Sequence, residues 1–190
     1  MSNKTLLRVI VLAVASLGLM FIGRHSALSE YFSVEGLHKL ILEAGAYGIA
    51  LFVVLYALGI LMNIPGVLYL FIGFMVYGEF NGFLIVYLAS FVAVLVHFFF
   101  ARFMAGEALA EIKQPFIKKQ LAKLQTHPIR TILVLRVIFY VSPPVNYALA
   151  LSAVRTRDFI LGSIVSLPVS ISVYYFLVMF AKDLWVRWIS

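Results

Sequence analysis

The sequence contains no cysteine, so disulfide bonds, thiolate metal sites and cysteine nucleophiles are excluded. Charged residues are also scarce, at 12% of the 190 positions, and the 8 acidic residues are outnumbered by 15 basic ones. A chain with so few charges cannot cover itself with the polar surface that a soluble globular domain needs.

Hydrophobic residues make up 64% of the chain, and its mean hydropathy is +1.05. Several apolar runs approach the ~20 residues that a helix needs to cross a ~30 Å hydrocarbon layer. These properties predict an all-α integral membrane protein. The net charge of +7 could indicate nucleic-acid binding, but the basic residues flank apolar runs. We therefore expect them to set the topology and to contact anionic membrane lipids, with no nucleic-acid partner.

The first apolar run, residues 5–23, follows Lys4 and includes Arg8. A secretory signal peptide would have this pattern, and residues 27–29 resemble a cleavage site, but we favour a retained membrane anchor. Residues 30–43 place apolar side chains at helical spacing with charges on the other side. They predict an amphipathic helix that lies along the membrane surface.

Two later apolar runs are interrupted by proline. Residues 46–77 are broken at Asn63-Ile64-Pro65-Gly66, and residues 131–152 are broken at Pro143-Pro144. Each is followed by a run of spanning length, residues 83–101 and residues 159–181. The segment 102–130 between them holds six basic residues, which predict a cytoplasmic connector on anionic headgroups. All of this forms a single membrane domain over residues 1–190.

The two halves of this pattern resemble each other. A shift of 79 positions superposes Pro65 on Pro144 and Glu79 on Asp158, and it also pairs Gly73 with Ser152 and Phe80 with Phe159. Residues 46–101 and 131–181 are thus two copies of one unit, a broken run followed by a span. Ordinary similarity of composition is the alternative explanation.

Each broken run has about 15 residues before the proline and about 10 after it, and such helices are too short for a full crossing at ~1.5 Å per residue. A re-entrant helical hairpin fits these lengths, and a single helix kinked at proline is the alternative. A hairpin plus one span is an odd number of crossings, so the second copy would be inverted. The predicted fold is an inverted repeat of hairpin plus transmembrane helix, with an N-terminal anchor and amphipathic helices.

The basic residues test this topology. With the N-terminus in the cytoplasm, ten basic residues fall on the cytoplasmic side, and only Arg24, Lys39, Lys182 and Arg187 fall outside. This asymmetry agrees with the positive-inside rule. We expect the cytoplasmic membrane of a bacterium.

A helix broken inside the membrane frees backbone groups that lipid cannot satisfy, so the breaks must lie against protein or a polar cavity. The breaks therefore predict a polar substrate site lined by the tips. Its candidates are Asn63, Pro65, Gly66, Ser142, Pro143, Pro144 and Asn146, with Arg136 about two turns earlier.

Three stretches carry a family resemblance: residues 64–82 (IPGVLYLFIGFMVYGEFNG), residues 98–102 (FFFAR) and residues 135–168 (LRVIFYVSPPVNYALALSAVRTRDFILGSIVSLP). Together they resemble the DedA/VTT superfamily, also called SNARE-associated Golgi proteins, over roughly residues 45–180. The resemblance implies two opposed re-entrant hairpins. It also implies movement of lipids between leaflets, either phospholipid scrambling or recycling of undecaprenyl phosphate or phosphatidylethanolamine.

The resemblance assigns Arg136 as the membrane-embedded arginine of the second hairpin, Pro65-Gly66 as the first tip and Arg102 as the arginine of the FxxxR motif. The chain departs from the bacterial pattern where acids flank the first tip, since Leu55, Tyr56 and Val67 stand there. Ser142 stands about where a second arginine is expected. The resemblance therefore supplies no acid at the first tip for proton coupling.

Arg136 is the sharpest single signal, because an arginine within an apolar run usually faces the interior with a partner. Its guanidinium suits a phosphate, although an internal pair or snorkelling to the interface would also explain it. We expect Arg102 to anchor the cytoplasmic end and to meet headgroups.

Four titratable residues are candidates for coupling: Glu43, Glu79, His97 and Asp158. The simpler interpretation of the acids is helix capping or pairing at the interface. For His97, which could relay protons, the simpler interpretation is a satisfied group near the cytoplasmic boundary.

No hydrolytic constellation is present in the sequence, so we expect a protein that is not an enzyme and uses no cofactor or metal. The favoured function is a transporter or scramblase for a phosphate-bearing lipid, either undecaprenyl phosphate or a glycerophospholipid. A secondary transporter of a small anion or other solute is one alternative. A membrane assembly factor without transport activity is the other.

Overall fold

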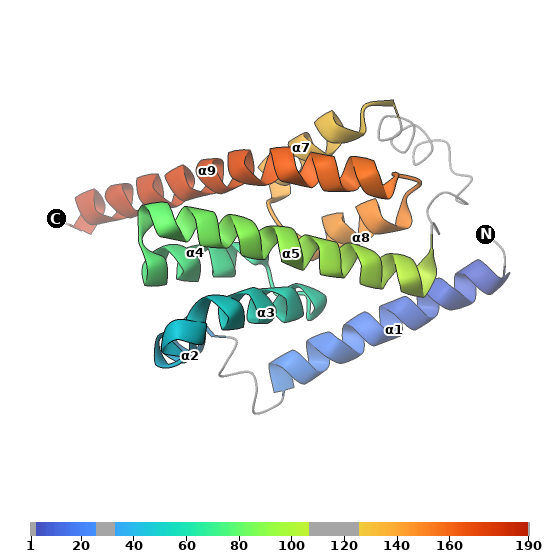
Figure 1. The fold of residues 1–190 in the computed structure, drawn as a ribbon, viewed down its shortest axis with the longest axis horizontal. Coiled ribbons are helices and arrows are strands. Elements are labelled where there is room, and N and C mark those ends of the chain that lie inside the picture. Colours follow the sequence, from blue (N-terminus) through green and yellow to red (C-terminus); the bar gives the residue numbers. More distant parts are fainter. Residues whose placement is uncertain (1–2, 26–32, 107–125, 190) are drawn as a thin grey trace.

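The computed structural model describes residues 3–25, 33–106 and 126–189, with side chains described for residues 5–21, 33–106 and 126–180. These residues form eight α-helices and one short 3₁₀ turn (Figure 1). In chain order the elements are α1 (Asn3–His25), α2 (Val34–Glu43), η2 (Gly45–Tyr47), α3 (Gly48–Leu61), α4 (Gly66–Tyr77), α5 (Glu79–Ala105), α7 (Pro128–Phe139), α8 (Pro143–Leu151) and α9 (Thr156–Ile189). Most of the predicted basic connector lies outside the described residues.

Within the described residues, two helices are long and apolar enough to cross a membrane, α5 and the part of α9 up to Phe180. The count rises to three if α2 and the segment from Gly45 to Leu61, which meet at 120°, form one bent span. Helices of this kind indicate an integral membrane protein. The predicted anchor is the helix α1, whose apolar part is shorter, from Thr5 to Phe21, and its crossing of the membrane stays a prediction.

Both proline breaks are sharp turns between separate helices. In the first, Asn63 adopts the left-handed conformation with φ 62°, and Pro65 caps α4 in extended conformation. In the second, Tyr140 has φ 51°, and Pro143-Pro144 occupy the first positions of α8, where a missing N–H does no harm. Figure 1 shows the chain turning back on itself at both breaks, so neither run is one kinked helix.

The two hairpins point at each other. In Figure 1 the α3–α4 hairpin enters from the left and the α7–α8 hairpin enters from the right, while α5 and α9 run antiparallel beside them. The tips touch directly, because the Gly66 N–H donates to the carbonyl of Val141 at 3.1 Å. This is the opposed arrangement that the sequence predicted.

The register of the repeat differs from the prediction. Helices α4 and α8 begin at residues 66 and 143, and α5 and α9 begin at residues 79 and 156, so both pairs are 77 positions apart rather than 79. The left-handed turn residues Asn63 and Tyr140 have the same spacing. The correction arises because the turn geometry, not the proline, fixes where each returning helix starts.

The helix α2 is the predicted amphipathic segment. The Ser33 hydroxyl caps it by accepting the Gly36 N–H at 3.0 Å, and Leu37 and Ile41 are buried against the neighbouring helices. Lys39 and Glu43 stay exposed and form an ion pair of 3.8 Å. Residues 30–32 of the predicted helix lie outside the described residues.

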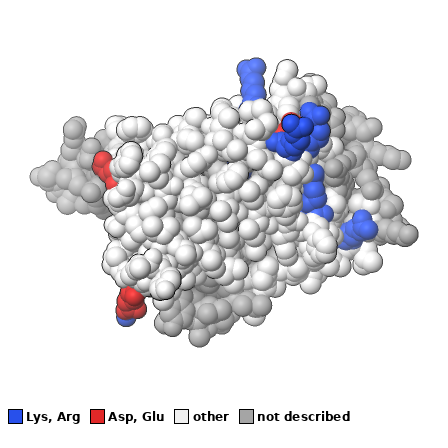
Figure 2. Space-filling view, in the orientation of Figure 1, with Lys and Arg blue, Asp and Glu red and all other residues white. Residues whose placement is uncertain are grey.

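Charges separate along the length of the molecule. Figure 2 shows most lysine and arginine side chains gathered towards the right-hand end, with an acidic group among them. At the left-hand end acidic side chains predominate, with a basic group beside one of them. In Figure 1 the right-hand end is where α1 begins, α5 ends and α8 passes into α9. The middle of the visible face is uncharged, as expected of a surface in hydrocarbon.

Candidate substrate site at the hairpin tips

Arg136, in the last turn of α7, is completely buried. One guanidinium nitrogen donates to the Asn146 side-chain oxygen at 3.4 Å, and the other terminal nitrogen donates to the Ser163 hydroxyl at 3.2 Å. The guanidinium carbon also lies 5.7 Å from the centre of the Phe159 ring. Within the part of the chain that the structure describes, no carboxylate lies at ion-pair distance from it. The buried cation therefore has only neutral partners there.

Several buried polar atoms near Arg136 have no hydrogen-bond partner among the described residues. They are Nε of Arg136, the side-chain nitrogen of Asn146 and both ring nitrogens of His97. His97 is completely buried in α5, so it is not the satisfied group near the boundary that its position in the sequence suggested. Unpaired polar atoms are costly in a protein interior, and their concentration here is typical of a site for a polar ligand or water.

Four helices bring these groups together. Arg136 comes from α7, Asn146 from α8, His97 from α5 and Ser163 from α9. The last three lie on the return helix of the second hairpin and on the two long helices, so the site forms only when the repeats are packed together. Gly162 permits the close packing of α9 on α7, because a Cβ there would lie 2.7 Å from the Ile132 side chain.

A cluster of hydroxyl groups lies where the two hairpin tips meet each other and α5. The Ser90 hydroxyl donates to Tyr56 at 3.0 Å and lies 3.2 Å from the hydroxyl of Tyr140, while Tyr56 donates to the carbonyl of Gly66 at 3.2 Å. All three side chains are buried. They tie the first hairpin, α5 and the second hairpin to one another.

The tips also line a cavity of about 280 Å³. The predicted site residues Pro65, Gly66 and Ser142 lie on its wall, together with Tyr140 and Tyr174. Arg136 does not line this cavity, so the predicted residues form two neighbouring groups rather than one. Pro143 is buried at the start of α8, and Pro144 is exposed.

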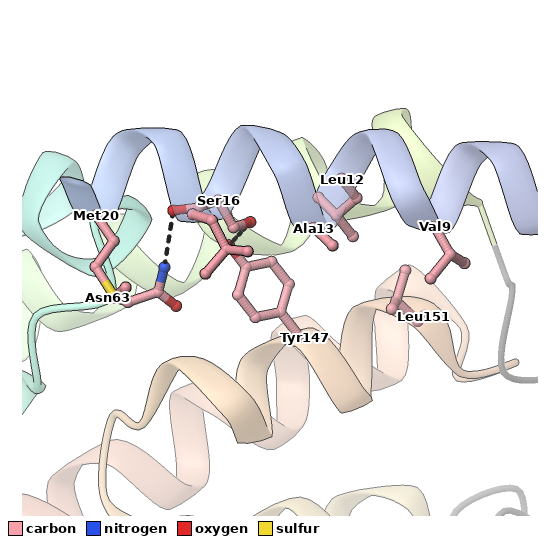
Figure 3. A pocket seen from close by; sticks show the side chains of 9 residues that line it. Val9, Leu12, Ala13, Ser16, Met20, Asn63, Tyr147 and Leu151 are labelled. Carbon is pink, nitrogen blue, oxygen red and sulfur yellow. Dashed lines mark hydrogen bonds between the residues drawn. The ribbon is translucent and has the colours of Figure 1, made fainter. Parts of the chain in front are cut away.

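Asn63 faces a different pocket, of about 460 Å³, between α1 and α8. Figure 3 shows Tyr147 extending from α8 towards α1. The Tyr147 hydroxyl lies 2.6 Å from the Ser16 hydroxyl, and Asn63 donates to the Ser16 carbonyl at 3.4 Å. The structure thus separates Asn63 from Arg136, although both were expected to line one site.

Arg102 holds the end of α8. Its guanidinium donates to the carbonyls of Ala150 at 2.9 Å, Ser152 at 2.6 Å and Val154 at 3.0 Å, and it stacks over Phe98. These carbonyls belong to the last turn of α8 and the connection to α9, which lack helical partners. Arg102 therefore acts as a clamp within the protein, and its expected contact with headgroups stays a prediction.

Within the described residues, none of the three acidic candidates pairs with Arg136; Glu43 and Glu79 are exposed, and Asp158 is partly buried. Glu79, in the first turn of α5, accepts a hydrogen bond of 2.6 Å from Tyr175. Asp158, in the first turn of α9, pairs with Arg155 at 2.8 Å, and Glu43 pairs with Lys39. Glu79 and Asp158 lie in the first turns of their helices, where negative charge is favourable. Glu43 is the last residue of α2, where the helix dipole does not favour an acid.

A comparison with protein families matches residues 64–180, more than half of the chain, to the VTT domain. The chain belongs to the VTT domain family. The predicted resemblance is thereby confirmed, and the match begins within the first tip, at Ile64. Searches of curated proteins and of solved structures gave no match.

The matched VTT domain contains Arg136, Asn146, His97 and Ser163, but not Tyr56, which lies in α3 before it. Sequence reasoning missed Ser90, Tyr140, Tyr147 and Ser163 as site residues. One signal was available for α9, since Ser163, Ser166 and Ser170 recur at helical spacing, and all three are buried. No comparable spacing marks Ser90 or Tyr140.

Proposed function

We propose that this VTT domain protein moves a phosphate-bearing lipid between the two leaflets of a membrane. The hairpins are re-entrant in this proposal, α5 and α9 cross the bilayer, and the tips meet at mid-depth. Arg136 binds the phosphate transiently while the lipid chains remain in the hydrocarbon. Undecaprenyl phosphate and glycerophospholipids both offer the required headgroup.

The burial of Arg136 without an acidic partner among the described residues carries this proposal. An unpaired buried ion carries an effective penalty of several kcal/mol, which a bound anion would offset. The Nε of Arg136 is still available for a hydrogen bond, and a guanidinium can hold two phosphate oxygens at once. Asn146 and His97 contribute further unpaired nitrogens beside it.

The opposed hairpins supply a route for the headgroup. The contact between the tips rests on one backbone hydrogen bond, from Gly66 to Val141, and on the hydroxyl groups of Tyr56, Ser90 and Tyr140. Small relative movements of the two repeats would break these contacts and open the site to one leaflet at a time, as in other inverted-repeat transporters.

The charge distribution supports an orientation. The end of the molecule that carries most of the basic side chains, with the N-terminus, lies in the cytoplasm according to the positive-inside rule, and the opposite end lies outside. In a bacterium this membrane would be the cytoplasmic one.

Reconstitution into vesicles of phosphatidylethanolamine and phosphatidylglycerol tests the proposal. We expect the wild-type protein to expose a fluorescent phospholipid of the inner leaflet to a quencher added outside, and Arg136→Gln to abolish this exchange. Arg130→Gln is the matched control, because Arg130 lies on the same helix but is exposed. Equal exchange by both variants would overturn the role of Arg136.

The same vesicles separate the alternatives. Uptake of a small anion without lipid exchange would favour a solute transporter, and absence of both activities would favour an assembly factor.

A further inference from the structure

The pocket between α1 and α8 is an apolar groove with one polar end. Its walls are Val9, Leu12, Ala13, Leu17, Met20 and Leu151, and its polar end consists of Ser16, Asn63 and Tyr147 (Figure 3). Its volume of about 460 Å³ falls within the roughly 300–1,000 Å³ of small-ligand sites. The groove exists because α1 packs against α5 and α3 and leaves a space above α8.

The polar end of the groove adjoins the Arg136 site. Tyr147 bonds to α1 on one side, and its ring packs edge-on against His97 with the ring centres 4.1 Å apart. Asn146, the preceding residue of α8, binds Arg136. Consecutive helical residues point about 100° apart, because an α-helix has 3.6 residues per turn. Tyr147 of α8 therefore faces the groove, while Asn146 faces the buried site.

The occupant of the groove follows from its surroundings. α1 exposes large apolar side chains along its length, including Leu7, Val14 and Phe21 at 62% or more, as expected of a helix that borders hydrocarbon. Lipid chains fill apolar grooves in that layer. The hydroxyl and amide groups at the polar end suit the polar part of a lipid rather than its tail.

We propose that this groove is the lateral entrance of the transporter, in which one acyl chain of a phospholipid lies while its phosphate reaches Arg136. Tyr147 separates the groove from His97 and closes the entrance by its bond to Ser16. This inference rests on the function proposed above. It adds a role for α1, which lies outside the matched VTT domain.

Two neighbouring substitutions on α1 test the groove. Ala13→Trp places a bulky ring in the groove, whereas Val14→Trp places the same ring on the outward face, where Val14 is 64% exposed. We expect Ala13→Trp to slow lipid exchange about tenfold and Val14→Trp to change it less than about twofold, because only the first raises the barrier to entry. Ala13→Leu is a milder block and should give an intermediate rate if the tryptophan variant folds poorly.

Photolabelling reports on occupancy independently of transport. A phospholipid with a diazirine midway along one acyl chain, in the same vesicles, should label Leu12, Ala13 and Leu151 in the wild-type protein. Val14→Trp should keep this labelling, and Ala13→Trp should lose it. Labelling spread evenly over the outward face of α1 would overturn the groove as a binding site.

The two proposals fail in different ways. Equal lipid exchange by Ala13→Trp and Val14→Trp, with an active wild-type protein, would overturn the entrance and leave the transport function standing. Absence of exchange by the wild-type protein would overturn the transport function and with it the entrance.

Discussion

Two arginines show how much the surroundings decide at the scale of the residue. Arg136 is buried with neutral partners and an unpaired Nε, while Arg102 donates to three backbone carbonyls at the end of α8. In the sequence both follow apolar residues at a helix end. Of these two arginines, Arg136 alone has a buried side-chain nitrogen without a hydrogen-bond partner among the described residues.

The clamp predicts a specific weakness at Arg102. Arg102→Lys keeps the positive charge but cannot reach three carbonyls with one ammonium group, so we expect it to lose about 1–3 kcal/mol of stability. Thermal unfolding in detergent, followed by helical circular dichroism, measures the loss. If Arg102 contacted headgroups instead, the lysine would preserve both stability and lipid exchange.

At the scale of the element, each tip is a short turn whose shape depends on close contact with the other tip. Gly66 begins α4 beside Val141, and its N–H donates across the gap between the hairpins. A Cβ on Gly66 would lie 2.6 Å from the Cβ of Val141 and 2.8 Å from the Tyr56 hydroxyl. The tips can meet in this way only because residue 66 has no side chain.

Gly66→Ala should therefore push the hairpins apart and destabilise the protein by about 1–3 kcal/mol, the usual effect of overpacking. Gly18→Ala is the matched control, since a Cβ there meets nothing within 4 Å and alanine favours helix over glycine by about 1 kcal/mol. Unfolding temperatures of the two variants decide the matter. A Gly66→Ala protein as stable as Gly18→Ala would contradict the observed tip contact.

For the whole molecule, the central feature is the opposition of two hairpins along an axis with most of the basic side chains at one end (Figures 1 and 2). Lys39 in α2 and Arg155 before α9 are both well exposed, with 76% and 82% of their side chains accessible. In Figure 1, α2 and the start of α9 lie at opposite ends of the molecule.

The absence of cysteine makes this arrangement easy to test. Lys39→Cys and Arg155→Cys introduce single thiols, and an impermeant maleimide added to intact cells should modify only the first. Permeabilised cells should show modification of both thiols. Modification of both in intact cells would place the two ends on the same side and contradict the inverted arrangement.

The sequence by itself determined the class of protein, the positions of both breaks, the amphipathic α2 and the family. These features are local, since apolar length, proline and helical spacing act over a few residues. The repeat register was off by two positions, because the prolines sit differently in the two turns.

Only the tertiary structure decided which polar residues meet. The sequence allowed Arg136 to snorkel, His97 to lie near the boundary and Arg102 to reach headgroups, and the packing of α5, α8 and α9 determined their actual surroundings. The cluster of Tyr56, Ser90 and Tyr140 joins residues 34 to 84 positions apart. Contacts of that range depend on how whole helices pack, and no local pattern of residues encodes them.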